Sequence, residues 1–349
     1  MIIETTSMNK TDFTEVKKLL ATPKDIIIFG HRNPDGDAIG SSLGLMHYLN
    51  KYGHQVKVLY PSDYPANFGW LKGLDDAIIF DHDEALAARA IEKAEIAFFL
   101  DFNTLDRIDK MGDLVSEVDC VKINIDHHLD PDYFSDYLWW KHEASSTCEM
   151  VYKFITKLGD EDKIDVTIGE CLFTGLITDT GSFKFSTNPD VYRICGNLKE
   201  IGVNDHLIQQ RLFQNLDEKH LRILGQALAH RMQIFPEYRT GLIYLSRRDF
   251  AEYDIQRGDT EGIVNYLLSL KDVRMAIFVT QQPNIIKLSL RSKGDFSVQE
   301  IATKYFNGGG HKNASGGYQH AGLGKTIDKI KAILPEYKDM LNDDTLFPE

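Results

Sequence analysis

Short apolar runs alternate with helix-like stretches from Asp25 to Ile125, and this alternation constrains the fold more than any other feature. Such a βαβ rhythm predicts an α/β fold with a mostly parallel sheet and helices on both faces. Ligands of sheets of this kind bind beyond the carboxyl ends of the strands. The expected strands are Asp25–Phe29, Val56–Tyr60, Ala77–Phe80, Ile96–Leu100 and Val121–Ile125, and the expected helices span 38–52 and 84–93.

The second half of the chain has a different pattern. It is expected to be largely helical from Ser146 to about His230, and strand-like runs then return. Because 349 residues exceed one ordinary core, two domains are expected. We predict a first domain at 1–190, a helical connector at 191–232 and a smaller α/β domain at 233–340, with a loosely held tail at 342–349. The later strands are expected at Met232–Phe235, Leu242–Leu245, Met275–Val279 and Ile285–Leu290.

Composition indicates a soluble, cytoplasmic protein that does not enter a membrane. Hydrophobic residues make up 43% and charged residues 26% of the chain. The first residues contain early acids and do not resemble a secretory signal, and no apolar run is long enough to span a bilayer. The four cysteines lie far apart and are expected to be buried free thiols. A net charge of −13 argues against a broad basic surface for long duplex nucleic acid, but it allows short anionic substrates.

One imidazole and two carboxylates follow the first expected strand within a few residues. They are His31, Asp35 and Asp37, and Pro34 and Gly36 between them favour a tight turn. A ligand set of nitrogen and oxygen without sulfur suits Mn²⁺, Mg²⁺ or a similar divalent ion. The same run also fits an ordinary surface Asn-Pro-Asp-Gly turn, and the motif alone leaves both interpretations open.

Three further sites carry polar side chains at the ends of apolar segments. Asp101 follows Ile96–Leu100, and Asp179 follows a helix-like apolar stretch; each acid also fits a helix cap or a turn. The triplet Asp126-His127-His128 follows the strand at 121–125, and such a triplet is hard to explain by a purely structural role. Adjacent histidines point in different directions, so one can bind metal while the other faces substrate. Asp126 is expected to orient the metal-binding imidazole.

Taken together, these side chains suffice for two divalent ions if one carboxylate bridges them. A two-metal centre activates a water and clamps a phosphoryl group. The residues alone therefore predict a hydrolytic metal centre, without its substrate. The candidate ligands are His31, Asp35, Asp37, Asp101, His127 and Asp179.

The His-x-Asn-Pro-Asp-Gly-Asp-Ala-Ile-Gly-Ser run and the Asp-His-His triplet resemble the DHH phosphoesterase superfamily. The resemblance implies that His31, Asp35 and Asp101 bind one metal. It implies a second metal on Asp37, Asp101, His127 and Asp179, with Asp101 as the bridge. It further implies that His128 contacts the scissile phosphate or its leaving group, beside Asp126. Two Mn²⁺ ions are the expected cofactors, with Mg²⁺ or Co²⁺ as alternatives.

A glycine-rich run in the C-terminal half, Asn307 to Gly317, resembles the signature of the DHH-associated substrate domain. Three glycines let successive backbone N–H groups close on an anion, and the neighbouring side chains add donors. Arg291 is expected to pair with a phosphate or a carboxylate, and Arg107 also with phosphate. A flexible glycine hairpin with a solvated arginine, and a helix-surface role for Arg107, stay open. The expected substrate-binding residues are Arg107, Arg291, Gly308, Gly309, Gly310, His311 and Ser315.

Within the superfamily, the two-domain size and this signature resemble the group of nanoRNA-degrading oligoribonucleases and 3′-phosphoadenosine 5′-phosphate phosphatases. The implied reaction is hydrolysis of short single-stranded RNA, 3′-phosphoadenosine 5′-phosphate or linear dinucleotides in a cleft between the two domains. The alternatives are an exopolyphosphatase or pyrophosphatase, and a nucleotide- or RNA-binding protein without catalysis. The sequence leaves open whether the protein forms a homodimer.

Overall fold

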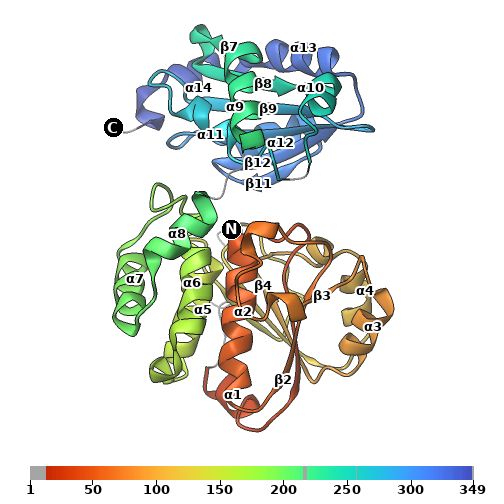
Figure 1. Cartoon of the computed structure of the whole chain (residues 1–349), viewed down its shortest axis with the longest axis vertical. Helices are drawn as coiled ribbons and strands as arrows, with labels where there is room; N and C mark the ends of the chain where they lie inside the picture. The colour runs from red at the N-terminus through yellow and green to blue at the C-terminus, as the bar shows by residue number, and fades with distance from the viewer. Residues whose placement is uncertain (1–12, 215–217, 257, 348–349) are drawn as a thin grey trace, which may run out of the picture. The chain divides into compact units, whose positions relative to one another are not determined.

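The computed structural model describes residues 13–214, 218–256 and 258–347. The chain divides into two compact units, Met1–Asn215 and Leu216–Glu349 (Figure 1). The segment 1–12, part of the start judged not to be a secretory signal, lies outside the described residues. Within the described part, no helix is long and apolar enough to cross a membrane.

The N-terminal unit is built on a six-stranded sheet in the order β3-β2-β1-β4-β5-β6, in which every neighbouring pair is parallel. The expected parallel α/β sheet is therefore confirmed, and β6 is an additional strand. The strands are β1 (Asp25–Phe29), β2 (Gln55–Tyr60), β3 (Ile78–Ile79), β4 (Ile96–Leu100), β5 (Val121–Asp126) and β6 (Tyr137–Trp140).

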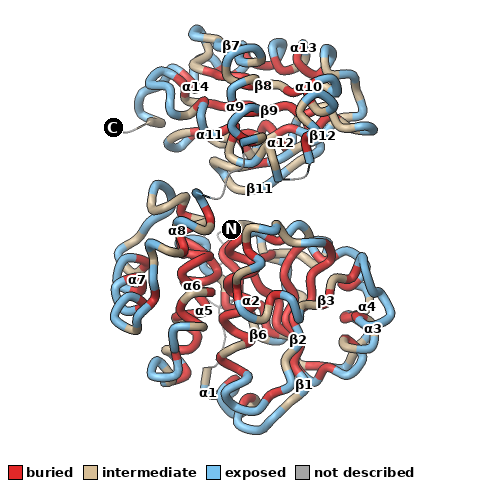
Figure 2. Tube along the Cα trace, viewed as in Figure 1, coloured by how far each residue is buried: buried red, intermediate tan, exposed pale blue. Residues whose placement is uncertain are grey.

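Helices cover both faces of this sheet. Within β1, Ile26 and Ile28 belong to a core with α2, α5 and α6, whereas Ile27 and Phe29 belong to a second core with α3 and α4. Because both faces are covered, the central strands are apolar along their length and buried (Figure 2). The helices are α1 (Phe13–Leu19), α2 (Gly36–Asn50), α3 (Glu84–Glu92), α4 (Lys110–Ser116), α5 (Thr147–Lys157), α6 (Val166–Asp179), α7 (Pro189–Ile201) and α8 (Asp205–Phe213).

The C-terminal unit contains a second six-stranded sheet, in the order β11-β12-β10-β9-β8-β7. Only the β8–β9 pair is parallel; the other four pairs are antiparallel. The core on one face includes α12 and α13, and that on the other includes α9 and α11. The elements are α9 (Glu218–His230), β7 (Met232–Phe235), β8 (Thr240–Leu245), α10 (Arg247–Glu252), α11 (Ile263–Leu268), β9 (Met275–Gln281), β10 (Ile286–Ser292), α12 (Val298–Phe306), β11 (Gly309–His311), β12 (Ala314–Gln319), α13 (Leu323–Ile333) and α14 (Lys338–Asn342).

The helices of the expected connector are divided between the units. The first unit includes α7 and α8, and the second begins just before α9. The described part of the tail, residues 342–347, is better held than expected, because the ring of Phe347 stacks on Phe296 with centroids 6.4 Å apart and lies 4.2 Å from the guanidinium carbon of Arg274. All four cysteines are buried free thiols, as expected.

Candidate metal centre

The polar residues that follow β1, β4 and β5 meet at one edge of the N-terminal sheet. These three strands are adjacent and parallel, so their carboxyl ends lie side by side. His31 comes shortly after β1, Asp101 directly follows β4, and Asp126 is the last residue of β5. The strand pattern seen in the sequence therefore brings three of the predicted sites together.

The turn after His31 leads into α2, and Asp35 is the N-cap of that helix. Its Oδ1 accepts hydrogen bonds from the backbone N–H groups of Asp37, at 3.0 Å, and Ala38, at 3.1 Å. Gly36 is required here because a Cβ atom would lie 2.3 Å from the hydroxyl oxygen of Thr178 in α6. The close approach of the two helices brings Asp37 near Asp179, the last residue of α6.

Asp101 lies at the centre of the cluster and faces imidazoles with both oxygens. Its Oδ2 is 3.6 Å from Nε2 of His31, and its Oδ1 is 3.4 Å from Nε2 of His127. The side chain is almost completely buried, and the backbone adopts a left-handed conformation with φ of 67°. A non-glycine residue in this region costs free energy and is held there only by its surroundings. The geometry is that of a carboxylate that can bridge two cations.

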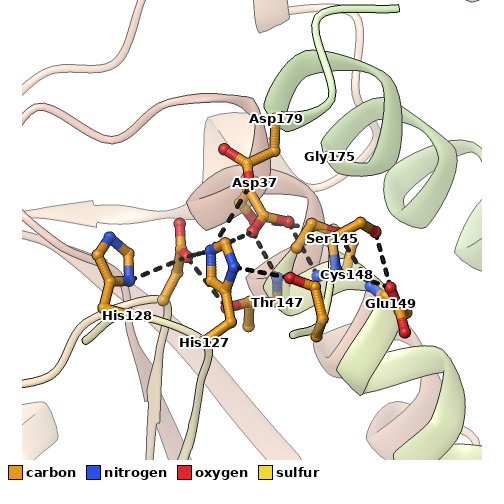
Figure 3. Close-up of polar contacts among 12 residues, drawn as sticks. Asp37, His127, His128, Ser145, Thr147, Cys148, Glu149, Gly175 and Asp179 are labelled. Atoms are coloured by element: carbon orange, nitrogen blue, oxygen red, sulfur yellow. Dashed lines mark hydrogen bonds and ion pairs between the residues drawn. The ribbon is translucent and has the colours of Figure 1, made fainter. Parts of the chain in front are cut away.

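His127 is the meeting point of the second set of side chains. Its Nε2 lies 3.8 Å from Oδ2 of Asp37 and 3.5 Å from Oδ2 of Asp179 (Figure 3). Gly175 in α6 leaves room for this arrangement, since a Cβ atom there would lie 2.6 Å from Oδ1 of Asp37. Asp35 faces the other set, with Oδ2 3.9 Å from Nε2 of His31.

Asp126 contacts a different imidazole from the one expected. Its Oδ1 lies 2.8 Å from Nδ1 of His128, whereas Nδ1 of His127 lies 3.3 Å from the backbone oxygen of Ala144. The expectation that Asp126 orients the metal-binding His127 is therefore wrong. The carboxylate of Asp126, at the end of β5, contacts the second histidine of the triplet instead.

Two residues that were not predicted from the sequence hold the carboxylates in place through hydrogen bonds. The backbone N–H of Thr147 donates to Oδ2 of Asp37 at 2.6 Å, and that of Cys148 donates to Oδ1 at 2.9 Å. The hydroxyl of Thr147 donates to Oδ1 of Asp101 at 3.0 Å. Both residues lie at the N-terminus of α5, beside Asp37 in Figure 3. A Ser-x-x-Glu capping pattern at Ser146 marks this helix start in the sequence, but not its contact with Asp37.

Burial and charge shift the pKa values of the cluster in opposite directions. Burial, followed by the charges of Asp101 and Asp179, raises the pKa of Asp37 well above its usual range. Burial also raises the pKa of Asp179, to about 7. For Asp101, burial acts the same way, but hydrogen bonds with the two histidines outweigh it and hold the pKa well below its usual range. A metal-free site therefore retains protons that a cation can replace.

The donor set fits a divalent cation. Three groups of side chains in the N-terminal unit each offer ligand atoms that lie within 4.8 Å of one another, all of them imidazole nitrogens or carboxylate oxygens. Donors of this kind, without thiolate, suit Mn²⁺, Mg²⁺ and related ions. The groups are His31, Asp35 and Asp101; Asp37, His127 and Asp179; and Asp101, Asp126 and His128.

Arg107 lies close enough to this site to act on it. It belongs to the 3₁₀ turn Leu105–Ile108, and its side chain is exposed. Its backbone oxygen accepts a hydrogen bond from the N–H of Arg32 at 2.8 Å, which ties the turn to the loop that carries His31. Burial lowers the pKa of His31, but the contacts with Asp101 and Asp35 outweigh it and raise the pKa, while the positive charge of Arg107 opposes this rise.

The predicted substrate residues of the C-terminal unit lie on neighbouring strands. Arg291 in β10 is opposite Ala314 in β12, which in turn pairs with His311 in β11. Arg291 is half-buried, its burial lowers the pKa of the guanidinium, and the guanidinium donates to the backbone oxygen of Leu290 at 2.9 Å. The hydroxyl of Ser315 donates to the backbone oxygen of His311 at 2.8 Å and so closes the hairpin.

The glycine run itself is an edge strand rather than a loop. Gly309 and Gly310 pair with Gly316 and Ser315, and β11 is the last strand of its sheet. Glycine is required at Gly308, where a Cβ atom would lie 1.9 Å from the backbone oxygen of Gly316. Glycine is needed there because two glycine-rich segments pair closely. The sequence had left open a flexible hairpin or an anion-binding loop for this run.

Comparison with known proteins agrees with this architecture. The model of the DHH family N-terminal domain matches residues 25–176, and that of the DHHA1 domain matches residues 241–343. The bifunctional oligoribonuclease and PAP phosphatase NrnA of Thermus thermophilus is 30% identical over 303 residues, which cover 86% of each chain. The protein of the same name from Bacillus subtilis is 25% identical over 87% of this chain and 92% of its own length.

One solved structure is closely similar over nearly the full length. The crystal structure of an exopolyphosphatase-related protein from Bacteroides fragilis is 36% identical and superposes with a TM-score of 0.92, covering 95% of this chain and 97% of that one. Together with the geometry at the sheet edge, these matches show that the chain belongs to the DHH family of phosphoesterases, with a DHHA1 domain in its C-terminal unit.

Proposed function

We propose that this protein hydrolyses short oligoribonucleotides, 3′-phosphoadenosine 5′-phosphate or linear dinucleotides with two divalent cations. The observation that carries the proposal is the position of Asp101, whose two oxygens face two separate sets of side chains. A carboxylate in this position lets two cations share one ligand. Two adjacent cations can activate a water and stabilise the leaving oxygen of a phosphate ester. The names of the relatives from Thermus thermophilus and Bacillus subtilis support the choice of substrates.

The metal ligands follow from the two sets. His31, Asp35 and Asp101 would hold one cation, and Asp37, Asp101, His127 and Asp179 the other. Mn²⁺ is the first candidate, with Mg²⁺ or Co²⁺ as alternatives, because all ligand atoms are nitrogen or oxygen. Thr147 and Cys148 keep the carboxylates in place before a cation arrives.

His128 is proposed to contact the scissile phosphate or its leaving oxygen. With Nδ1 held by Asp126 at 2.8 Å, the ring is fixed in one orientation and Nε2 is the nitrogen that would meet the substrate. Asp126 is fully buried, so its charge acts on the imidazole with little screening by water. The pair can thus hold a proton at a fixed point, as general acid catalysis requires.

The far end of the substrate would be bound by the C-terminal unit. We propose that Arg291 and His311 contact a terminal phosphate, with backbone groups of Gly308, Gly309 and Gly310 nearby. The hydrogen bond that holds the half-buried guanidinium of Arg291 on the backbone oxygen of Leu290 supports this role, since an arginine held in a fixed orientation recognises phosphate with little loss of freedom. Ser315 would act by closing the hairpin that carries His311. Arg107 is proposed to contact phosphate on the metal side.

The experiment compares two aspartates at opposite ends of α6. Asp179→Asn removes a proposed metal ligand, whereas Asp165→Asn changes the N-cap about 20 Å away and keeps a side chain that can cap the helix. Turnover of di- to pentaribonucleotides and of 3′-phosphoadenosine 5′-phosphate is measured with Mn²⁺. We expect Asp179→Asn to lose turnover and Asp165→Asn to retain it. Lack of turnover of both substrate types by the unaltered protein, with Mn²⁺ bound, would refute the proposal.

A polyphosphate hydrolase is the second candidate, and the similarity to the exopolyphosphatase-related protein from Bacteroides fragilis favours it. Faster phosphate release from polyphosphate than from any nucleotide in the same assay would support it. The same variants separate both enzymes from a binding protein without catalysis, because the loss of Asp179 would then leave nucleotide affinity unchanged.

A further inference from the structure

We propose that Phe185 and Lys184 form a subsite that stacks on a base of the substrate and contacts a neighbouring phosphate. This proposal rests on the proposed function, because it requires a nucleotide at the metal centre. The two residues lie in the loop that follows α6, only a few positions after Asp179. No metal ligand or substrate residue predicted from the sequence lies in this loop, which connects α6 to α7.

The ring of Phe185 packs against the backbone at Gly181 and is otherwise half exposed. A Cβ atom on Gly181 would lie 2.8 Å from two ring carbons of Phe185, so the ring rests against the backbone of Gly181. The residue is nevertheless 51% exposed, which is unusual for a phenylalanine close to a buried site. A half-exposed aromatic ring that packs against the backbone offers a surface on which a nucleotide base can stack.

The loop is hydrogen-bonded to the residue that follows α6. Thr180 is fully buried, and its hydroxyl accepts a hydrogen bond from the N–H of Phe183 at 3.0 Å. Its backbone oxygen accepts from the N–H groups of Lys184, at 2.8 Å, and Phe185, at 3.0 Å. Phe185 is thus bonded to the residue directly after Asp179, and the ring and the metal-site carboxylate belong to one turn of the chain.

The backbone of this turn is strained in a way that needs such support. Gly181, Ser182 and Phe183 have φ of 55°, 59° and 64°, three successive left-handed residues of which two carry side chains. Phe183 is anchored by stacking on Tyr192 in α7, with centroids 5.6 Å apart and an interplanar angle of 28°. Strain that the surroundings fix in one conformation is a feature of binding sites, where it reduces the entropy lost when a ligand binds.

Lys184 adds a positive charge beside the ring. It is exposed, and within the described part of the chain it forms no ion pair. The net negative charge of the protein lies in residues 1–215, so Lys184 is an exposed cation within the acidic unit, five positions after Asp179. A lysine beside an exposed aromatic side chain is a common arrangement for binding single-stranded nucleic acid, where the cation contacts phosphate and the ring contacts the base.

The kinetic test replaces Phe185 by leucine and by tyrosine. Tyr52→Leu is the matched control, since Tyr52 is also an exposed aromatic residue, located beyond the far end of α2 from Asp37. With a diribonucleotide, Phe185→Leu is expected to raise KM by roughly 5- to 100-fold, the equivalent of one lost base–aromatic stack. Phe185→Tyr should keep KM close to that of the unaltered protein, and Tyr52→Leu should not alter KM. A diribonucleotide with one abasic position identifies the stacked base, because the effect of Phe185→Leu should vanish when that base is missing.

The second measurement does not depend on hydrolysis. A dinucleotide carrying 2-aminopurine is titrated with the full-length protein in Ca²⁺, and quenching of its fluorescence reports stacking. Quenching with the unaltered protein and Phe185→Tyr, but not with Phe185→Leu, is the expected result. Equal quenching by Phe185→Leu would overturn the proposal, as would an equal loss of turnover on normal and doubly abasic substrates, which would make Phe185 a structural residue. Failure of the unaltered protein to hydrolyse any nucleotide would refute the proposed function instead, and quenching would still test the subsite.

Discussion

Replacing Thr147 with valine removes one hydrogen bond from the proposed bridging carboxylate and little else. The hydroxyl of Thr147 donates to Oδ1 of Asp101 at 3.0 Å, and the backbone N–H of the same residue, which valine retains, donates to Asp37 at 2.6 Å. Valine has nearly the same shape as threonine. Because Thr147 has no exposed surface, water cannot easily take the place of the lost hydroxyl.

The size of the effect follows from the charge of the acceptor. A hydrogen bond to an ionised group contributes about 1.5–3 kcal/mol, which corresponds to a change of roughly 10- to 100-fold in a binding constant. Mutation of residues that hydrogen-bond to metal ligands lowers metal affinity or activity by the same range, about 10- to 100-fold. Since Asp101 faces both sets of ligands, Thr147→Val should weaken the binding of both cations and not of one alone.

Calorimetric titration of the metal-free protein with Mn²⁺ measures this directly. The control is Thr174→Val in α6, which makes the same chemical change at an equally buried residue whose hydroxyl donates only to the backbone oxygen of Glu170 within its own helix, at 2.8 Å. Both variants should remain folded, and only Thr147→Val should lose Mn²⁺ affinity. If the two variants bind Mn²⁺ equally well, Asp101 is not the shared ligand that the geometry indicates.

Three further predictions concern protons, backbone space and a buried ion pair. Burial lowers the pKa of His127, but the surrounding carboxylates outweigh it and raise the pKa well above its usual value, so Mn²⁺ must displace a proton. Mn²⁺ affinity should therefore fall as the pH is lowered towards the usual histidine pKa of about 6.5, and a pH-independent calorimetric constant would contradict this. Gly308→Ala should lower the melting temperature because its Cβ meets Gly316, whereas Gly309→Ala, with nothing within 4 Å, should not. Burial opposes the ionised form of Asp249, but its hydrogen bonds with Arg231 and a serine keep its pKa below the usual value. Asp249→Ala should therefore reduce stability by about 2–3 kcal/mol in urea unfolding at pH 7, a difference that shrinks as the pH falls below about 4.

The parts of the site that could be predicted are those that local sequence determines. His31, Asp101 and the triplet at 126–128 follow apolar strands, and parallel strands bring their carboxyl ends to one edge whatever the details of the packing. Local sequence marked Asp179 only as the end of a helix, and it was the resemblance to the DHH superfamily that placed it beside Asp37. That proximity depends on Gly36 and Gly175, which let α2 and α6 approach.

The parts that could not be predicted depend on contacts between distant segments. Thr147 and Asp37 are 110 positions apart, and the capping pattern at Ser146 does not indicate which carboxylate the helix will meet. Asp126 was assigned to the wrong imidazole because side-chain direction at a strand end depends on packing around it. The run at Gly309 has the composition of a loop, and only its pairing with β12 makes it a strand.

Burial makes cation binding and protonation of this site a single equilibrium. Asp37 accepts two backbone hydrogen bonds that favour its ionised form, yet burial and the nearby charges of Asp101 and Asp179 raise its pKa well above the usual range. These opposing effects are reconciled only when a positive charge lies among the carboxylates. Protons supply it in the metal-free protein, and a divalent cation supplies it with two charges at one point. Because Thr147 and Cys148 already hold the carboxylate in position, a cation that replaces those protons gains its ligands without rearranging the backbone. It should stabilise the folded unit by an amount that grows with the logarithm of its affinity.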